Sequence, residues 1–314
     1  MFRRNAGPVL FDTPTLLEAG GAERFTMLKL IINGMSEGNP TASRTAFRVA
    51  RELATCEEEV PKPQRPQRSS DYSHGKLPAS LSIGLLNNVA RLRGFVNAIK
   101  RWPPQAQGVL DVGCGSFPVL AMAAAVYHPE AEINAIEINP YAAQNAAIMT
   151  NAFGVYNRIA INNADIANYR IAPGTTAAVT ETFNAALSGE PGPKIVQHLH
   201  NNGVPIITPT IAELRLDLPH ASFSQQVDLR RDSYANLAFT DKPDPVTMQP
   251  YVNLSASYAD DLGPVLAYGD DVITEGLSTH DNAKLFRALL AAGRSGHLTY
   301  ELGAWPFDPI IKHK

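Results

Sequence analysis

Short apolar runs of strand length alternate with helical segments through the middle of the chain. The runs are bounded by glycine, proline and asparagine, and the first is followed by an almost wholly apolar helical segment at 119–127. Apolar strands separated by helices are typical of a parallel sheet that is covered on both faces. We therefore expect an α/β Rossmann-like core over residues 72–209. Its predicted strands are 109–112, 132–137, 158–162, 176–180 and 204–208.

The flanking regions follow different patterns. Residues 1–57 show helical periodicity and predict a small helical N-terminal extension, which could cover an active site, mediate self-association or serve only in packing. Residues 58–71 are rich in proline and lack an apolar pattern, as is typical of a linker. Residues 210–314 contain stretches with the period of two that predicts strands. The clearest periodic stretches are 15–33, 41–55, 210–218 and 296–302.

Composition and charge exclude several classes of function. The chain has 314 residues, 45% of them hydrophobic and 18% charged, which fits a soluble globular protein. A net charge of −3 gives no basic surface for nucleic acid. Cys56 and Cys114 are too few for a disulfide framework or a zinc site, so we expect no metal. Charged residues interrupt segment 1–20, and no apolar run approaches the ~18 residues of a membrane span, so we expect a cytoplasmic protein without a signal peptide or a membrane partner.

A glycine turn after the first core strand is the main candidate for a cofactor site. In Val109-Leu110-Asp111-Val112-Gly113-Cys114-Gly115-Ser116, Asp111 lies in the strand, and Gly113 and Gly115 let a ligand approach the backbone. The turn lacks the full GxGxxG spacing of nicotinamide-binding folds. The second strand ends in Glu137, where a carboxylate can bind both hydroxyls of a ribose. The third leads to Asp165, placed to meet an adenine edge.

This set of residues resembles the class I S-adenosylmethionine-dependent methyltransferases. The resemblance implies S-adenosyl-L-methionine as cofactor, bound by Asp111, Gly113, Gly115, Glu137, Ile138, Ala164 and Asp165. The alternative is a doubly wound domain that binds no nucleotide.

Two glutamates beyond the fourth strand narrow the class. Glu181 stands at the carboxyl end of that strand, and Glu190 follows nine positions later. Two carboxylates can hold a planar guanidinium from separate edges. The stretch from Glu181 to Glu190 resembles the double-glutamate loop of the protein arginine methyltransferases, which implies that both residues are catalytic and that Glu181 also lies at the cofactor. The alternative is a strand-end acid and a solvated loop acid.

Two weaker stretches extend the resemblance. Asp71-Tyr72-Ser73-His74 and the later Arg91 look like the family's cofactor lid, which implies that Tyr72 packs on the cofactor and that Arg91, or Arg93 in its place, pairs with its carboxylate. The same arginines also fit the solvated face of an ordinary amphipathic helix. Ser278-Thr279-His280-Asp281 resembles the family's Thr-His-Trp loop, which implies a catalytic His280 that lines the substrate pocket. Asp281 replaces the family's Trp, which suits a smaller and more polar substrate, and His280 could equally be a surface residue.

Taken together, the resemblance implies an N-methyltransferase with a β-barrel-like substrate and dimerisation domain over 210–314, acting as a homodimer. Within the family the chain most resembles the free L-arginine N-methyltransferases of nitrosourea (streptozotocin-type) antibiotic biosynthesis, so the expected substrate is the guanidino group of L-arginine. A protein arginine methyltransferase, a methyltransferase acting on another small-molecule amine or carbon, and a non-enzymatic scaffold with this fold remain alternatives.

Overall fold

The computed structural model describes residues 7–55, 79–183, 191–218, 221–239, 249–255, 266–267, 296–302 and 310–313. The chain divides into two compact units. The first comprises Met1–Gln64, Leu77–Thr180 and Val204–Thr208, and the second comprises Arg65–Lys76, Glu181–Gly203 and Pro209–Lys314. The domain boundaries expected at 57, 71 and 209 stay a prediction.

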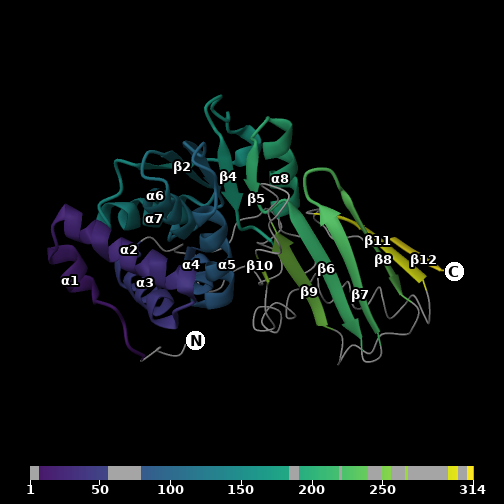
Figure 1. Ribbon diagram of the computed structural model, residues 1–314, viewed down its shortest axis with the longest axis horizontal. Coiled ribbons are helices and arrows are strands. Elements are labelled where there is room, and N and C mark those ends of the chain that lie inside the picture. The colour runs from purple at the N-terminus through teal and green to yellow at the C-terminus, as the bar shows by residue number, and fades with distance from the viewer. Residues whose placement is uncertain are drawn as a thin grey trace, which may run out of the picture. The chain divides into compact units, whose positions relative to one another are not determined.

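A parallel sheet forms the centre of the first unit (Figure 1). Its strand order is β3-β2-β1-β4-β5, so the order reverses between β1 and β4, and open α/β sheets bind ligands outside the carboxyl ends of the strands at such a point. The predicted Rossmann-like core is therefore confirmed. The strands are β1 (Gly108–Val112), β2 (Glu132–Glu137), β3 (Ile159–Asn163), β4 (Ala177–Thr180) and β5 (Ile206–Thr208).

The apolar segment forms α6 (Val119–Tyr127), which is buried over most of its length, as a helix that is apolar on all sides must be. Arg158 caps its C-terminus, donating from Nη1 to the Ala125 carbonyl at 2.7 Å and from Nη2 to that of His128 at 3.1 Å. The other helical elements are α4 (Ala79–Gly84), η3 (Leu85–Asn87), α5 (Val89–Lys100), α7 (Pro140–Ala152) and η4 (Ile166–Asn168).

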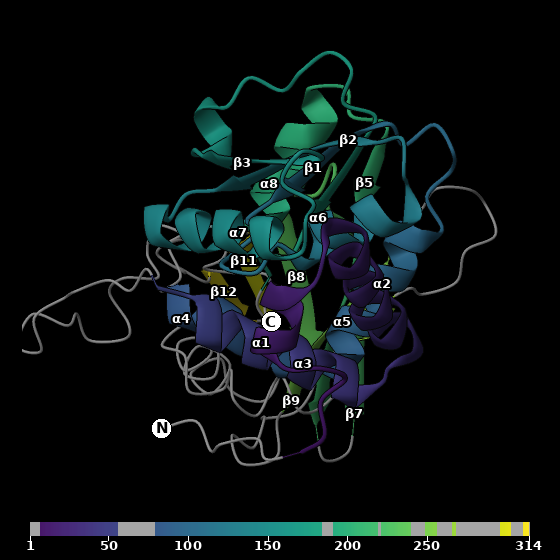
Figure 2. The same ribbon diagram turned by 90° about the vertical axis from the view of Figure 1, so that its left-hand side faces the viewer.

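Three N-terminal helices pack onto this core, namely α1 (Thr13–Glu18), α2 (Gly21–Glu37) and α3 (Pro40–Leu53). Helix α2 contacts α5 and α6, and α3 contacts α4, η3 and α7 (Figure 2). The helical periodicity predicted over 15–33 extends across two helices, because the chain is extended at Ala19 and Gly20 and a new helix starts at Gly21. Leu28, Ile31, Ile32 and Met35 of α2 are fully buried, and each stabilises the fold by about 1.5–3 kcal/mol relative to exposure.

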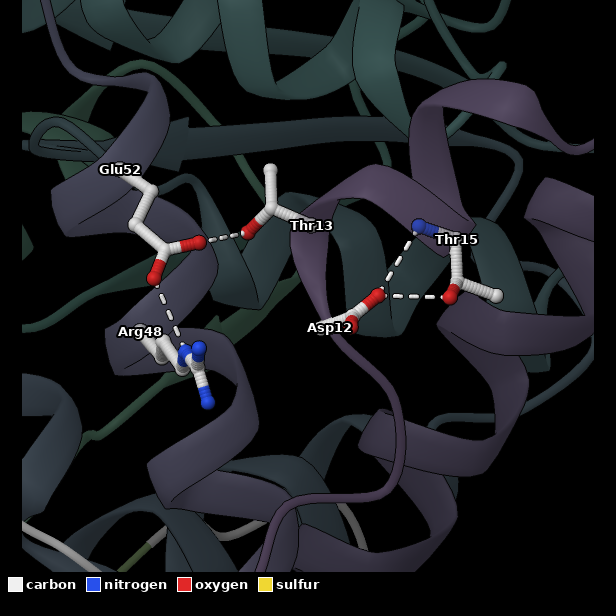
Figure 3. Close-up of polar contacts among 5 residues, drawn as sticks. All are labelled: Asp12, Thr13, Thr15, Arg48 and Glu52. Atoms are coloured by element: carbon white, nitrogen blue, oxygen red, sulfur yellow. Dashed lines mark hydrogen bonds and ion pairs between the residues drawn. The ribbon is translucent and has the colours of Figure 1, made fainter.

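Polar contacts join α1 to α3 (Figure 3). Thr13 Oγ1 donates to Glu52 Oε2 at 2.5 Å, and Arg48 Nε donates to Glu52 Oε1 at 2.9 Å. The bond from Thr13, followed by that from Arg48, lowers the pKa of Glu52. At the start of α1, Asp12 Oδ1 accepts from Thr15 N at 3.0 Å and from Thr15 Oγ1 at 2.6 Å. The predicted helical extension is thus a bonded layer of the first unit.

The second unit is mainly antiparallel β-structure. Strands β10-β9-β6-β7 form one sheet and β12-β11-β8 another, and α8 (Gly192–Asn201) precedes them in the chain. The strand patterns at 210–218 and 296–302 are confirmed, whereas closure into a barrel stays a prediction. The strands are β6 (Ile211–Leu218), β7 (Ala221–Asp228), β8 (Tyr234–Phe239), β9 (Gln249–Ser255), β10 (Leu266–Ala267), β11 (Gly296–Glu301) and β12 (Ile310–His313).

None of the helices in the described ranges has the length and apolar character that crossing a membrane requires.

Candidate functional site

The glycine turn after β1 folds back onto the end of β2. Gly113 and Gly115 have φ angles of 76° and 65°, a left-handed backbone that glycine adopts without steric cost. The N–H groups of Gly113 and Cys114 both donate to the Ile136 carbonyl, at 2.8 and 3.1 Å. These bonds fix the first half of the turn against the neighbouring strand.

The second half of the turn is bonded to side chains of the protein. The N–H of Gly115 donates to Glu137 Oε2 at 2.9 Å, and the N–H of Ser116 donates to Ser82 Oγ at 3.0 Å. All four consecutive amides from Gly113 to Ser116 therefore have partners within the chain. A turn that binds a pyrophosphate instead points its amides at the ligand. The bonding of this turn does not favour an anionic ligand.

Asp111 reinforces that conclusion. Its side chain is 1% exposed, and Oδ2 accepts from Ala121 N at 2.9 Å in the first turn of α6. The positive end of a helix is where an external anion would bind, and a carboxylate of the protein already takes one of its amides. Burial raises the pKa of Asp111 to about 7, against the bond from Ala121 and with a smaller contribution from the charge of Glu137.

Glu137 is held in one orientation at the carboxyl end of β2. It is 8% exposed, with Oε1 accepting from Asn139 N at 2.8 Å and Oε2 accepting from Gly115 N. Burial raises the pKa of Glu137, while the bonds from the amides of Asn139, Gly115 and Ile138 oppose the shift. A carboxylate has about four lone-pair sites, so both oxygens keep the capacity to accept from a pair of hydroxyls.

The end of β3 is tied to the same place. Asn163 Nδ2 donates to the carbonyl oxygens of Glu137, at 2.8 Å, and Ile138, at 3.2 Å. Ala164 N donates to the Glu137 carbonyl at 3.1 Å, and Asp165 Oδ1 caps η4 by accepting from Ala167 N at 3.0 Å. The predicted cofactor residues at the ends of β1, β2 and β3 are thus brought together by hydrogen bonds.

Sequence reasoning missed two residues that build this arrangement, Ser82 and Asn139, and did not predict the bonds from Asn163 to the end of β2. Asn139 carries a readable signal, because an asparagine before a proline is typical of a helix N-cap, and its Oδ1 accepts from Tyr141 N at 2.9 Å. Ser82 and Asn163 carry none, because their partners are distant in sequence.

The other predicted site residues lie in other segments of the chain. Arg91 lies in α5 and is 7% exposed. Glu181 is the first residue after β4 and is half-buried. Tyr72, Glu190 and His280 lie outside the described residues. Within the turn itself, burial raises the pKa of the Cys114 thiol well above its ordinary value, so this thiol is a packing group and not a nucleophile.

Comparison with known proteins shows the fold. No protein-family model matches the chain, and no curated protein matches its sequence. The PRMT1 enzyme–prozyme complex of Trypanosoma brucei with S-adenosylhomocysteine is 13% identical with a TM-score of 0.50, and the match covers 77% of this chain and 85% of that chain. Protein arginine methyltransferase 10 of Arabidopsis thaliana is 10% identical with a TM-score of 0.46, and the match covers 73% and 83%. The chain has the class I S-adenosylmethionine-dependent methyltransferase fold, similar to the T. brucei structure.

Proposed function

We propose that the chain is an S-adenosylmethionine-dependent N-methyltransferase that acts on the guanidino group of free L-arginine. The observation that carries the proposal is the bonding of the glycine turn. Its four amides are satisfied within the chain, and two buried carboxylates, Asp111 and Glu137, lie beside it. Because these amides are already bonded, the turn favours a nucleoside with free ribose hydroxyls over a dinucleotide with a negatively charged pyrophosphate.

The residues around the turn have distinct roles in this proposal. Glu137 accepts from the two ribose hydroxyls, and Ile138, Ala164 and Asp165 contact the adenine. Asp111, Gly113 and Gly115 shape the turn. At the methionine end, Tyr72 covers the cofactor and Arg91 pairs with its carboxylate. The bonds that hold the ends of β2 and β3 together support the grouping of the adenosine-binding residues.

The reaction needs an oriented nitrogen more than a strong base. Bound S-adenosylmethionine supplies an electrophilic methyl group on a positively charged sulfur. Glu181 and Glu190 hold the guanidinium by its N–H groups, so that one nitrogen directs its lone pair at that methyl group, and His280 lines the same pocket. As the new N–C bond forms, the C–S electron pair stays on sulfur, and the methylated nitrogen then gives a proton to water or to a neighbouring carboxylate.

A protein arginine N-methyltransferase is the second candidate, because the T. brucei structure to which the fold is similar belongs to an arginine methyltransferase. Asp281, which stands where the resembled loop has a tryptophan, favours the smaller and more polar free amino acid. Another small-molecule amine or carbon acceptor, and a scaffold without activity, are the remaining alternatives.

Two measurements test the proposal. Calorimetry should show binding of S-adenosylmethionine and S-adenosylhomocysteine but not of NAD⁺, and no heat with either adenosyl compound contradicts the cofactor. Mass spectrometry after incubation with S-adenosylmethionine should show added methyl groups on free L-arginine and none on an Arg/Gly-rich peptide. Methylated peptide alone identifies the second candidate, and no product from either acceptor contradicts both.

A further inference from the structure

Helix α4 rests directly on the glycine turn. A Cβ at position 115 would lie 2.9 Å from Ser82 Cβ, closer than real side chains approach. The left-handed backbone of Gly115 and the close approach of Ser82 therefore both favour glycine at this position. The expectation that Gly115 also lets a ligand approach the backbone stays a prediction.

A small hydrogen-bonded ring joins the two segments. Ser82 Oγ donates to the Ala79 carbonyl at 2.8 Å and accepts from Ser116 N at 3.0 Å. Ser116 Oγ donates to the same carbonyl at 2.9 Å, and Ser116 is 0% exposed. If the acceptor of an amide buried this far from water is removed, the folded state is destabilised by about the free energy of one hydrogen bond.

Helix α4 is itself held from two sides. It contacts α3 of the N-terminal layer and α7 of the core, and α7 begins just after Glu137. The turn is therefore bonded on one side to β2 and Glu137, and on the other to a helix that the N-terminal layer supports.

We propose that Ser82 is a positioning residue for the cofactor turn, and that the N-terminal helices contribute to cofactor binding through α4 and this hydroxyl. The proposal rests on the proposed function, because it takes the turn as the S-adenosylmethionine site. Ser82 acts on the ligand only through the backbone of Gly115 and Ser116.

The test compares Ser82→Ala with Ser80→Ala, a matched change at an exposed position of the same helix. S-adenosylhomocysteine is titrated calorimetrically into each protein, and amide hydrogen exchange is followed at Ser116. Ser82→Ala should weaken binding about tenfold and speed Ser116 exchange by a similar factor, whereas Ser80→Ala should leave both within about twofold of wild type. With S-adenosylmethionine and L-arginine, the KM for S-adenosylmethionine should rise while kcat at saturation stays near wild type.

The outcomes separate this proposal from the function on which it rests. Wild type that binds neither adenosyl compound contradicts the proposed cofactor. Wild type that binds, together with Ser82→Ala at wild-type affinity and exchange, contradicts only the positioning role. If Ser82→Ala does not fold, Ser116→Ala decides instead, because it removes only the hydroxyl bond to Ala79. That variant should weaken S-adenosylhomocysteine binding about threefold, and unchanged affinity overturns the proposal.

Discussion

At the scale of single residues, Asp111 combines deep burial with one helix-terminal hydrogen bond. Burial raises its pKa in the folded chain to about 7, from an ordinary value of 3.8. The folded state therefore holds a proton that the unfolded state has lost between those two pH values. The stability from this group is complete below about pH 4 and is lost as the pH rises towards 7.

Asp111→Asn should therefore remove part of the pH dependence of folding. Between pH 5 and pH 7, the unfolding free energy of wild type should fall by up to about 2 kcal/mol more than that of the variant, because the amide has no proton to lose. Urea unfolding at the two pH values measures the difference. If the difference in unfolding free energy between wild type and variant is the same at both pH values, Asp111 titrates normally in the folded state.

Glu181→Gln tests the proposal that Glu181 and Glu190 bind the substrate guanidinium. The amide keeps the size of the side chain but removes the charge that would hold a guanidinium, so turnover should fall by two or more orders of magnitude while cofactor affinity stays within a few fold. Product formation is measured by mass spectrometry and affinity by calorimetry. Glu132→Gln, an exposed position at the start of β2, is the matched control and should retain full activity. Near-normal turnover in Glu181→Gln contradicts the proposed role of Glu181 in binding the guanidinium.

At the scale of elements, two helices begin with the same Asn-Pro signal. Asn139 caps α7 beside Glu137, and Asn39 caps α3, where its Oδ1 accepts from Thr41 N at 2.9 Å. Comparing variants of the two asparagines therefore separates the loss of stability caused by a missing helix cap from an effect on cofactor binding.

Asn139→Ala and Asn39→Ala should each lower the unfolding free energy by about 1 kcal/mol. Only Asn139→Ala should also weaken S-adenosylhomocysteine binding, because Asn139 N holds Glu137 Oε1 and loss of the cap loosens that part of the backbone. Denaturant unfolding and calorimetry on both variants give the comparison. Equal cofactor affinities in the two variants would mean that the start of α7 does not position Glu137.

The elements were more predictable than the contacts between them. The strands and α6 follow from apolar runs, and α3 follows from local periodicity, because such patterns reflect burial along one segment. The break at Ala19 and Gly20 was missed although a Gly-Gly pair marks it. The link between Ser82 and Ser116 has no local signature, since a serine two residues earlier in the same helix is exposed.

In the candidate site, too, the positions of residues could be predicted better than the contacts between them. Asp111 and Glu137 could be predicted because they lie at strand ends, where sheet topology gathers side chains. Their hydrogen-bond partners, and the burial that raises the pKa values of both carboxyls, depend on how separate segments pack.

At the scale of the whole molecule, the N-terminal helices belong to the same compact unit as the sheet. Buried side chains of α2 meet α5 and α6, and no separate core is needed to explain their burial. We therefore expect the helical layer and the parallel sheet to unfold together.

Ile31→Ala should lower the unfolding free energy by about 2–5 kcal/mol, because it leaves a cavity at a fully buried position. Leu30→Ala, at a neighbouring residue that is 53% exposed, should change it by less than about 0.5 kcal/mol. Hydrogen exchange at the amides of β1 shows whether the loss reaches the sheet. Unchanged protection of β1 in destabilised Ile31→Ala would mean that the layer unfolds independently.

The internal bonding of the glycine turn also bears on the entropy of ligand binding. Fixing the backbone of one residue costs about 1–2 kcal/mol, and for residues 113–116 that cost is met during folding, since all four amides already have partners. A ligand at this turn would meet a preorganised surface and would lose no affinity to ordering it. Differences in affinity among related nucleosides should therefore reflect their direct contacts and not the rearrangement of this loop.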